Sequence, residues 1–168
     1  MSAEPGFNQN ETGAAPAVRL FREAHVPAVV LADAAALPTA PGAYLLLVEL
    51  AAPLTLSAPR PGGVLAPARY LYLGSARGPG GLRARLGRHL RAERRPRWHV
   101  DQVTAAGTVL AALAWLDGRE CAWRAAVQAR GAQVPVGGFG SSDCRRCPAH
   151  LLQLDAGPDD PRLRPGDG

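Results

Sequence analysis

The segment Gly42–Leu50 constrains the fold of this 168-residue chain more strongly than any other part of it. It is apolar apart from Glu49. Side chains alternate along a strand, so Tyr44, Leu46 and Val48 would point to one side and further apolar residues to the other. Both faces of such a strand must be covered, and the segment is therefore predicted to be a central strand of a sheet.

Residues 69–74 are predicted to form a second strand. The intervening residues, 51–68, are rich in proline and glycine, which argues against a crossover helix between the two strands. An antiparallel hairpin with a long loop is expected instead, and Tyr44 and Tyr72 can then face each other. A third strand is predicted over residues 108–115.

The first predicted helix follows a glycine-rich turn. Four glycines and a proline in residues 74–81 precede residues 82–91, where leucines recur every four positions. At about 100° per residue, Arg85 and His89 lie at the edge of this leucine stripe. Three further arginines are expected to point away from it: Arg83, Arg88 and Arg91.

The length and composition favour a single domain, because 168 residues that are 47% hydrophobic can bury one core. The folded unit is predicted over residues 37–154, with a second helix over residues 119–130. A flexible arm, residues 1–36, is expected to precede it. A disordered tail, residues 155–168, is expected to follow it, since that segment is dominated by proline, aspartate and glycine.

The chain is expected to be soluble and cytoplasmic. Its first residues lack the pattern of a secretion signal, and no apolar run reaches the roughly 18 to 20 residues of a membrane span. Three cysteines, an odd number, do not suggest a disulfide framework and favour a reducing compartment. Neither a membrane nor an obligate protein partner is indicated.

The basic residues suit a polyanionic partner. All 19 are arginine, and the net charge is +5. Several cluster in one stretch whose single acid is Glu93, and the alternative interpretation is a solvated charged face. Phosphate contacts of this kind would make binding steeply salt-dependent without reading sequence. The arginines expected to hold phosphates are Arg77, Arg88, Arg91, Arg94, Arg95 and Arg97.

Several short motifs occur in one order along the chain. Gly42-Ala43-Tyr44 is followed by Tyr72-Leu73-Gly74, by Arg85 and His89 one helical turn apart, and by Glu120 at the start of a later helix. Together they resemble the GIY-YIG nuclease superfamily. Ala43 and Leu73 stand where isoleucine is usual, but neither change touches a polar group. The sequence around Tyr72, Gly78, Trp98-His99 and Gly138 resembles that of the Uri-type branch, and the similarity runs over residues 37–154.

The resemblance implies an α+β fold in which helices flank a small three-stranded antiparallel sheet, and cleavage of nucleic-acid phosphodiesters. By similarity, Glu120 would hold one Mg²⁺ or Mn²⁺ ion, whose other ligands would be water and phosphate oxygens. Its alternative role is to stabilise the helix N-terminus. Arg85 would stabilise the phosphate charge. Gly74, Ser75 and His99 would lie along the nucleic acid, although His99 could equally pack against Trp98.

Tyr44 or Tyr72 would orient or deprotonate the attacking water. A phenol has a pKa near 10, so a nearby cation must favour the phenolate if it is the base. The sequence leaves open which tyrosine acts. It also leaves open whether His89 contacts a tyrosine or the phosphate, or is only structural. Single tyrosines on strands are common, and strand propensity alone is the alternative interpretation for each.

Cys144 and Cys147 with His150 have the spacing of metal ligands, and Cys121 could supply a fourth. A single Cys-x-x-Cys favours buried thiols over structural Zn²⁺. Ser142, Asp143 or His150 could instead reach the active face.

These features predict a metal-dependent endonuclease that acts on DNA in preference to RNA. Two alternatives stay open: a non-catalytic nucleic-acid-binding module with the same fold, and a zinc-stabilised interaction domain.

Overall fold

The computed structural model describes residues 29–30, 37–57, 62–91, 97–116, 119–129 and 131–154. The predicted flexible arm and disordered tail lie outside these residues, except for Val29 and Val30. The predicted domain limits therefore stay predictions.

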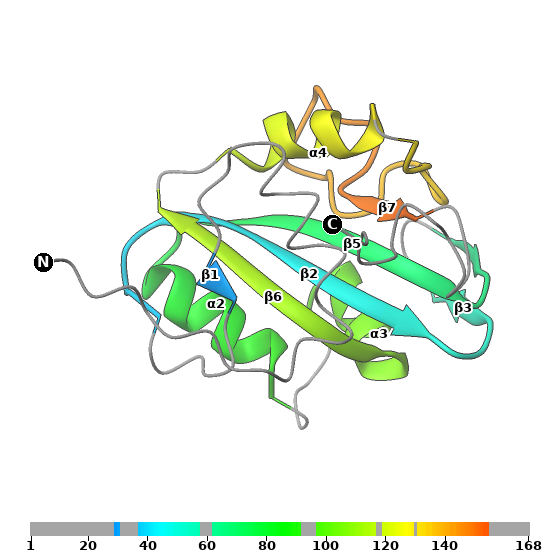
Figure 1. The fold of residues 1–168 in the computed structure, drawn as a ribbon, viewed down its shortest axis with the longest axis horizontal. Helices are drawn as coiled ribbons and strands as arrows, with labels where there is room; N and C mark the ends of the chain where they lie inside the picture. The colour runs from blue at the N-terminus through cyan, green and yellow to red at the C-terminus, as the bar shows by residue number, and fades with distance from the viewer. Residues whose placement is uncertain are drawn as a thin grey trace, which may run out of the picture.

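An antiparallel sheet of five strands, in the order β1-β6-β2-β5-β7, forms the centre of the fold (Figure 1). β2 (Gly42–Leu50) pairs along its whole length with β5 (Ala68–Ala76) on one side and with β6 (Thr108–Leu116) on the other. The prediction that the most apolar segment is the central strand is confirmed, and the three long strands are the three that were predicted. Two short strands extend the edges: β1 (Val29–Val30) beside β6 and β7 (Leu151–Gln153) beside β5.

Helices cover both faces of the sheet. In Figure 1, α2 (Gly81–His89) and α3 (His99–Ala106) lie on one side of the strands and α4 (Glu120–Gln128) on the other. This arrangement explains why β2 is apolar on both faces, because each face must leave water. The mixed α+β fold with helices flanking an antiparallel sheet is as predicted.

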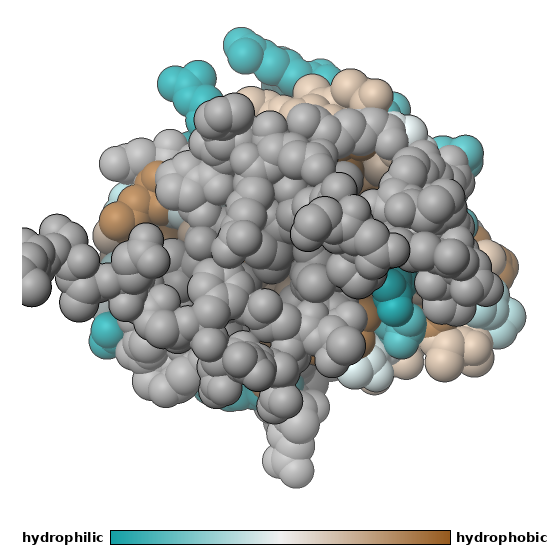
Figure 2. Space-filling view, in the orientation of Figure 1, coloured by the Kyte–Doolittle hydropathy of each residue, from teal (hydrophilic) through white to brown (hydrophobic). Residues whose placement is uncertain are grey.

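Two separate clusters of buried side chains follow from the alternation along the strands. Tyr44, Leu46 and Val48 of β2 pack with Leu82 and Leu86 of α2. On the opposite face, Leu45 and Leu47 pack with Leu71, Trp115 and Val127. The exposed residues of α4 include Ala122, Ala125 and Gln128. Pale apolar and hydrophilic side chains lie next to each other at the top of the molecule, where that helix lies (Figure 2).

Gly42, the first residue of β2, is required by a close approach of two strands. A Cβ atom at this position would overlap the carbonyl oxygen of Trp115 on β6 and contact Leu82 of α2. The glycine of the first motif thus lets the sheet and α2 come together.

The structure contains several elements that were not predicted, among them the edge strands β1 and β7, which extend the predicted three-stranded sheet to five strands. The segment expected to be a long loop contains a small hairpin of β3 (Leu54–Leu56) and β4 (Gly63–Leu65), whose strands are too short to give a clear period-two pattern. Helix α3 was not predicted, because its eight residues include the β-branched Val100, Val103 and Thr104 and show little helical periodicity. No helix among the described residues combines the length and apolar character needed to cross a membrane.

Candidate active-site cavity

A cavity of about 520 Å³ lies where β2, β5, α2 and α4 meet. Five of its lining residues are those on which the predicted chemistry depends: Tyr44, Tyr72, Arg85, His89 and Glu120. They lie on four elements that are distant in the sequence. The structure therefore brings the two phenols, the guanidinium, the imidazole and the carboxylate around one hollow.

The two tyrosines are diagonal neighbours on adjacent strands. Tyr44 is opposite Gly74 and Tyr72 is opposite Leu46, so both side chains project from the same face of the sheet. Their ring centroids are 6.2 Å apart. A Cβ atom on Gly74 would overlap the end of the Tyr44 ring, so the glycine of the second motif makes room for the tyrosine of the first.

Both phenols are held neutral by their surroundings. Burial, followed by the neighbouring Tyr72, raises the pKa of Tyr44 well above its usual value. Burial raises the pKa of Tyr72 to about 12, although Arg85 and a hydrogen bond from Tyr44 act in the opposite direction. Further positive charge in the cavity is thus needed before either tyrosine can ionise near neutral pH.

His89 connects Tyr44 to a buried carboxylate. The hydroxyl of Tyr44 lies 2.9 Å from Nε2 of His89, and Nδ1 of His89 lies 3.5 Å from Oδ1 of Asp101 on α3. Both His89 and Asp101 are 1% exposed. The imidazole is therefore fixed in orientation between a phenol and a carboxylate.

Asp101 is a site residue that the sequence analysis missed. Burial alone would raise its pKa, but the backbone N–H groups of Trp98 and Arg97, with the guanidinium of Arg88, lower it overall. Asp101 is the third residue of α3, and its carboxylate caps the start of that helix by accepting those N–H groups. The spacing of an acid three residues after a helix start could have indicated it.

Arg85 is held at the cavity by Trp98. Its guanidinium carbon lies 4.1 Å from the centroid of the indole ring, a favourable cation–π distance. The side chain is half-buried, and the stacking restricts it without neutralising its charge. Arg85 can therefore present a permanent positive charge to an anion in the cavity.

Glu120 is the first residue of α4 and faces the cavity with its carboxylate unpaired among the described residues. A carboxylate oxygen that lines a hollow and lacks a cationic partner suits a hard divalent cation. Ser142, Asp143 and His150, which were expected to be able to reach the active face, line the same cavity.

The other residues predicted to contact nucleic acid divide into three groups. Gly74, Ser75, Arg77, Arg97 and His99 line the cavity, and Arg77 and Arg97 are exposed. His99 also packs against Phe139, with ring centroids 5.8 Å apart. Arg94 and Arg95 lie outside the described residues.

Arg88 and Arg91 do not line the cavity, so their predicted contact with phosphate lacks geometric support. Arg88 pairs with the carboxylate of Asp101, and its guanidinium lies 4.5 Å from the Trp98 ring centroid. Arg91 donates through Nε to the carbonyl oxygen of Gly87 at 3.1 Å. The arginine run was expected to lack acidic partners apart from Glu93. This is wrong for Arg88, because its partner Asp101 lies after the run in the sequence.

The three cysteines and His150 converge beside the cavity. Cys121 on α4 meets Cys144, Cys147 and His150 from the segment before β7, and all four ligand atoms lie within 4.8 Å of one another. The sequence favoured separate buried thiols, whereas the structure forms a group that could bind a metal ion. Burial and the sulfur atoms of Cys147 and Cys144 raise the pKa of Cys121 to about 12. The group can thus be deprotonated together only if a cation offsets the negative charge.

Comparisons with known proteins gave one match. No curated protein and no solved structure matches the chain. The sequence profile of the domain of unknown function DUF123 matches residues 43–162. This segment contains all the predicted site residues and more than half of the chain, and the protein therefore belongs to the DUF123 family.

Proposed function

We propose that the chain is a divalent-metal-dependent endonuclease of GIY-YIG type, related to the Uri branch, that hydrolyses phosphodiester bonds in DNA, with RNA as the second candidate substrate. The proposal is carried by the convergence of Tyr44, Tyr72, Arg85, His89 and Glu120 on one cavity. The motif resemblance names the same residues. A hollow of about 520 Å³ is large enough for a phosphodiester and its flanking sugars.

Glu120 would hold the Mg²⁺ or Mn²⁺ ion, because its carboxylate faces the cavity and has no cationic partner among the described residues. When bound, such an ion neutralises charge on the phosphate and the leaving oxygen. A single protein carboxylate suffices since Mg²⁺ retains waters and takes phosphate oxygens as ligands.

Tyr72 is the better candidate for the base. Tyr44 is more deeply buried and is engaged with His89, whereas Tyr72 is 8% exposed at the cavity. When both ring nitrogens of His89 carry a proton, a chain of donors runs from His89 through Tyr44 to the oxygen of Tyr72 and stabilises its phenolate. The phenolate would take a proton from water while the water oxygen attacks phosphorus and the bond to the leaving oxygen breaks.

Arg85 would stabilise the charge that develops on the non-bridging oxygens, and its planar fork suits two of them. Arg77 and Arg97, exposed at the cavity, would contact flanking phosphates. These contacts explain why binding is expected to weaken steeply as salt rises.

The decisive experiment incubates the protein with labelled DNA and RNA oligomers in Mg²⁺, in Mn²⁺ and in excess chelator. Cleavage is expected in either metal and not in chelator. Glu120→Ala and Arg85→Ala should each lower the cleavage rate by about 100-fold or more while retaining binding. Cleavage that persists in chelator would reject the metal mechanism.

Glu49→Ala and Arg69→Ala are matched controls. These residues pair with each other at the far end of β2 and β5, at 3.1 Å, and do not line the cavity. Both variants should cleave at the wild-type rate. Salt-sensitive binding without cleavage in either metal would instead favour a non-catalytic nucleic-acid-binding module.

A further inference from the structure

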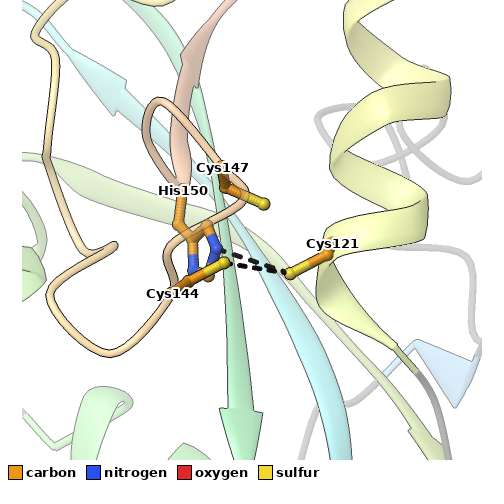
Figure 3. A group of neighbouring side chains, drawn as sticks. All are labelled: Cys121, Cys144, Cys147 and His150. Carbon is orange, nitrogen blue, oxygen red and sulfur yellow. Dashed lines mark hydrogen bonds between the residues drawn. The ribbon is translucent and has the colours of Figure 1, made fainter.

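The cysteine and histidine group beside the cavity has the dimensions of a metal site. Figure 3 shows Cys121 reaching from α4 toward Cys144, Cys147 and His150, with the four side chains pointing at a common centre. The Sγ atoms of Cys121 and Cys144 are 3.5 Å apart, and Cys121 Sγ lies 3.9 Å from Nε2 of His150. Ligands placed about 2.3 Å from a tetrahedral zinc ion would be about 3.8 Å from one another.

Other interpretations of the group fit these distances less well. The Cys121 and Cys144 sulfurs, at 3.5 Å, are too far apart for a disulfide, whose S–S bond is about 2.05 Å. A two-iron cluster needs ligands spread around two metal centres, whereas all four atoms here lie within 4.8 Å. Three sulfurs and one imidazole in one compact group favour a single Zn²⁺ ion.

Backbone N–H groups donate hydrogen bonds to one of the ligands, as they commonly do in metal sites. The N–H groups of Arg146 and Cys147 donate to the sulfur of Cys144. Such hydrogen bonds from an outer shell orient a thiolate and offset its charge.

The segment between α4 and β7 is held by core packing, in which Phe139 and Ala149 are buried, but by little regular structure. Among the described residues between α4 and β7, 129 and 131–150, there is no helix or strand apart from a single β-bridge at Gln133. The segment is closed by a few backbone hydrogen bonds, such as His150 N–H to Phe139 at 2.7 Å and Gly138 N–H to Pro148 at 2.6 Å. Irregular segments of this length are uncommon in small domains unless something binds them together.

We propose that Cys121, Cys144, Cys147 and His150 hold one structural Zn²⁺ ion that fastens the start of α4 to the segment before β7. Four protein ligands leave no open position, so the ion stabilises the fold and does not activate water. Binding releases the three thiol protons to solvent and leaves a site with a net charge of about −1. The exposed Arg145 and Arg146, between two of the ligands, suit that charge.

The site also positions the proposed catalytic carboxylate, an extension that rests on the proposed function. Glu120 is adjacent to Cys121, and Cys144 and His150 themselves line the cavity. Fixing Cys121 to the segment before β7 therefore fixes Glu120 against the wall that carries Tyr72 and Arg85.

The test measures metal in protein purified without chelator. About one zinc per chain is expected in the wild type. The double variant Cys121→Ser and Cys147→Ser changes two ligands that do not line the cavity, and it should contain about tenfold less zinc and unfold at a lower temperature. Ser141→Ala, in the same segment but neither a ligand nor a lining residue of the cavity, is the matched control and should keep its zinc.

A second measurement uses only the wild type, in case the double variant does not fold. Titration with a mercurial thiol reagent should release the zinc in step with modification of the three cysteines. Replacement by Co²⁺ should give the visible absorption of a tetrahedral site with thiolate ligands. A wild-type protein that contains no zinc, and takes up neither added Zn²⁺ nor Co²⁺, would overturn the proposal.

The outcomes separate this site from the proposed nuclease activity. Zinc in the wild type without any cleavage would refute the nuclease and leave the structural site standing. Cleavage by a protein that binds no zinc would refute the structural site alone. If the double variant folds and cleaves at the wild-type rate, the ion does not position Glu120.

Discussion

Single residues at the cavity are matched to one another across strands. Gly74 is opposite Tyr44, and the aromatic ring lies where any larger residue at position 74 would place its Cβ atom. The ring cannot easily move aside, because its hydroxyl lies 2.9 Å from His89. Position 74 must therefore be glycine for the Tyr44 ring to occupy its place.

Gly74→Ala is expected to destabilise the fold by about 1–3 kcal/mol, because the added methyl group overlaps the Tyr44 ring. Urea unfolding followed by circular dichroism measures the change. Gly78→Ala is the matched control, since a Cβ atom there would meet nothing within 4 Å. Equal stabilities of the two variants would show that the Tyr44 ring is not fixed as described.

At the scale of elements, the contact between α2 and α3 depends on a buried charge. Asp101 of α3 accepts a hydrogen bond from Arg88 of α2 and faces His89 of the same helix. The arginine run on α2 thus has two roles: Arg85 faces the cavity, while Arg88 joins the two helices.

Arg88→Ala should lower the free energy of unfolding by about 3 kcal/mol, because it leaves the carboxylate of Asp101 buried without its guanidinium partner. Arg83→Ala on the same helix is the comparison. It loses one hydrogen bond to the carbonyl oxygen of Leu37 and should cost about 1 kcal/mol. Denaturant unfolding of both variants measures the difference, and similar losses would contradict a structural role for Arg88.

At the scale of the whole molecule, the core beneath the cavity includes ionisable groups. Tyr44 and Tyr72 belong to the same buried cluster as Leu46, Leu82 and Phe139. Their phenols must stay neutral for this core to remain packed. The free energy of unfolding is therefore expected to decrease at alkaline pH.

The pKa of Tyr72 is about 12 in the folded chain and about 10 when unfolded. A raised pKa stabilises the fold below the unfolded value, and this contribution is lost as the pH rises from about 10 to about 12. Between about pH 8 and about pH 11, Tyr72→Phe should lose about 1.4 kcal/mol less stability than the wild type. Urea unfolding of both proteins at the two pH values tests this. Any contribution from Cys121 is the same in the two proteins and cancels in the difference. Equal losses would show that Tyr72 is not desolvated.

Local patterns were enough to predict most of the regular structure. The limits of β2 are as predicted, and those of β5, β6, α2 and α4 differ by a few residues. The three long strands are apolar runs and α2 carries a leucine stripe, because each of them buries one or two faces in the core. Helix α3 and the short edge strands carry no such pattern, and only packing against their neighbours defines them.

The sequence by itself determined which side chains this protein offers for chemistry and which strand is central, because residue type and period act locally. Only the tertiary structure decided which of them meet. Arg88 pairs with Asp101 and does not line the cavity. Cys121 lies beside Cys144, Cys147 and His150, although it precedes Cys144 by 23 residues in the sequence. Such meetings depend on how helices pack on a sheet and how an irregular segment folds back, and neither follows from spacing along the chain.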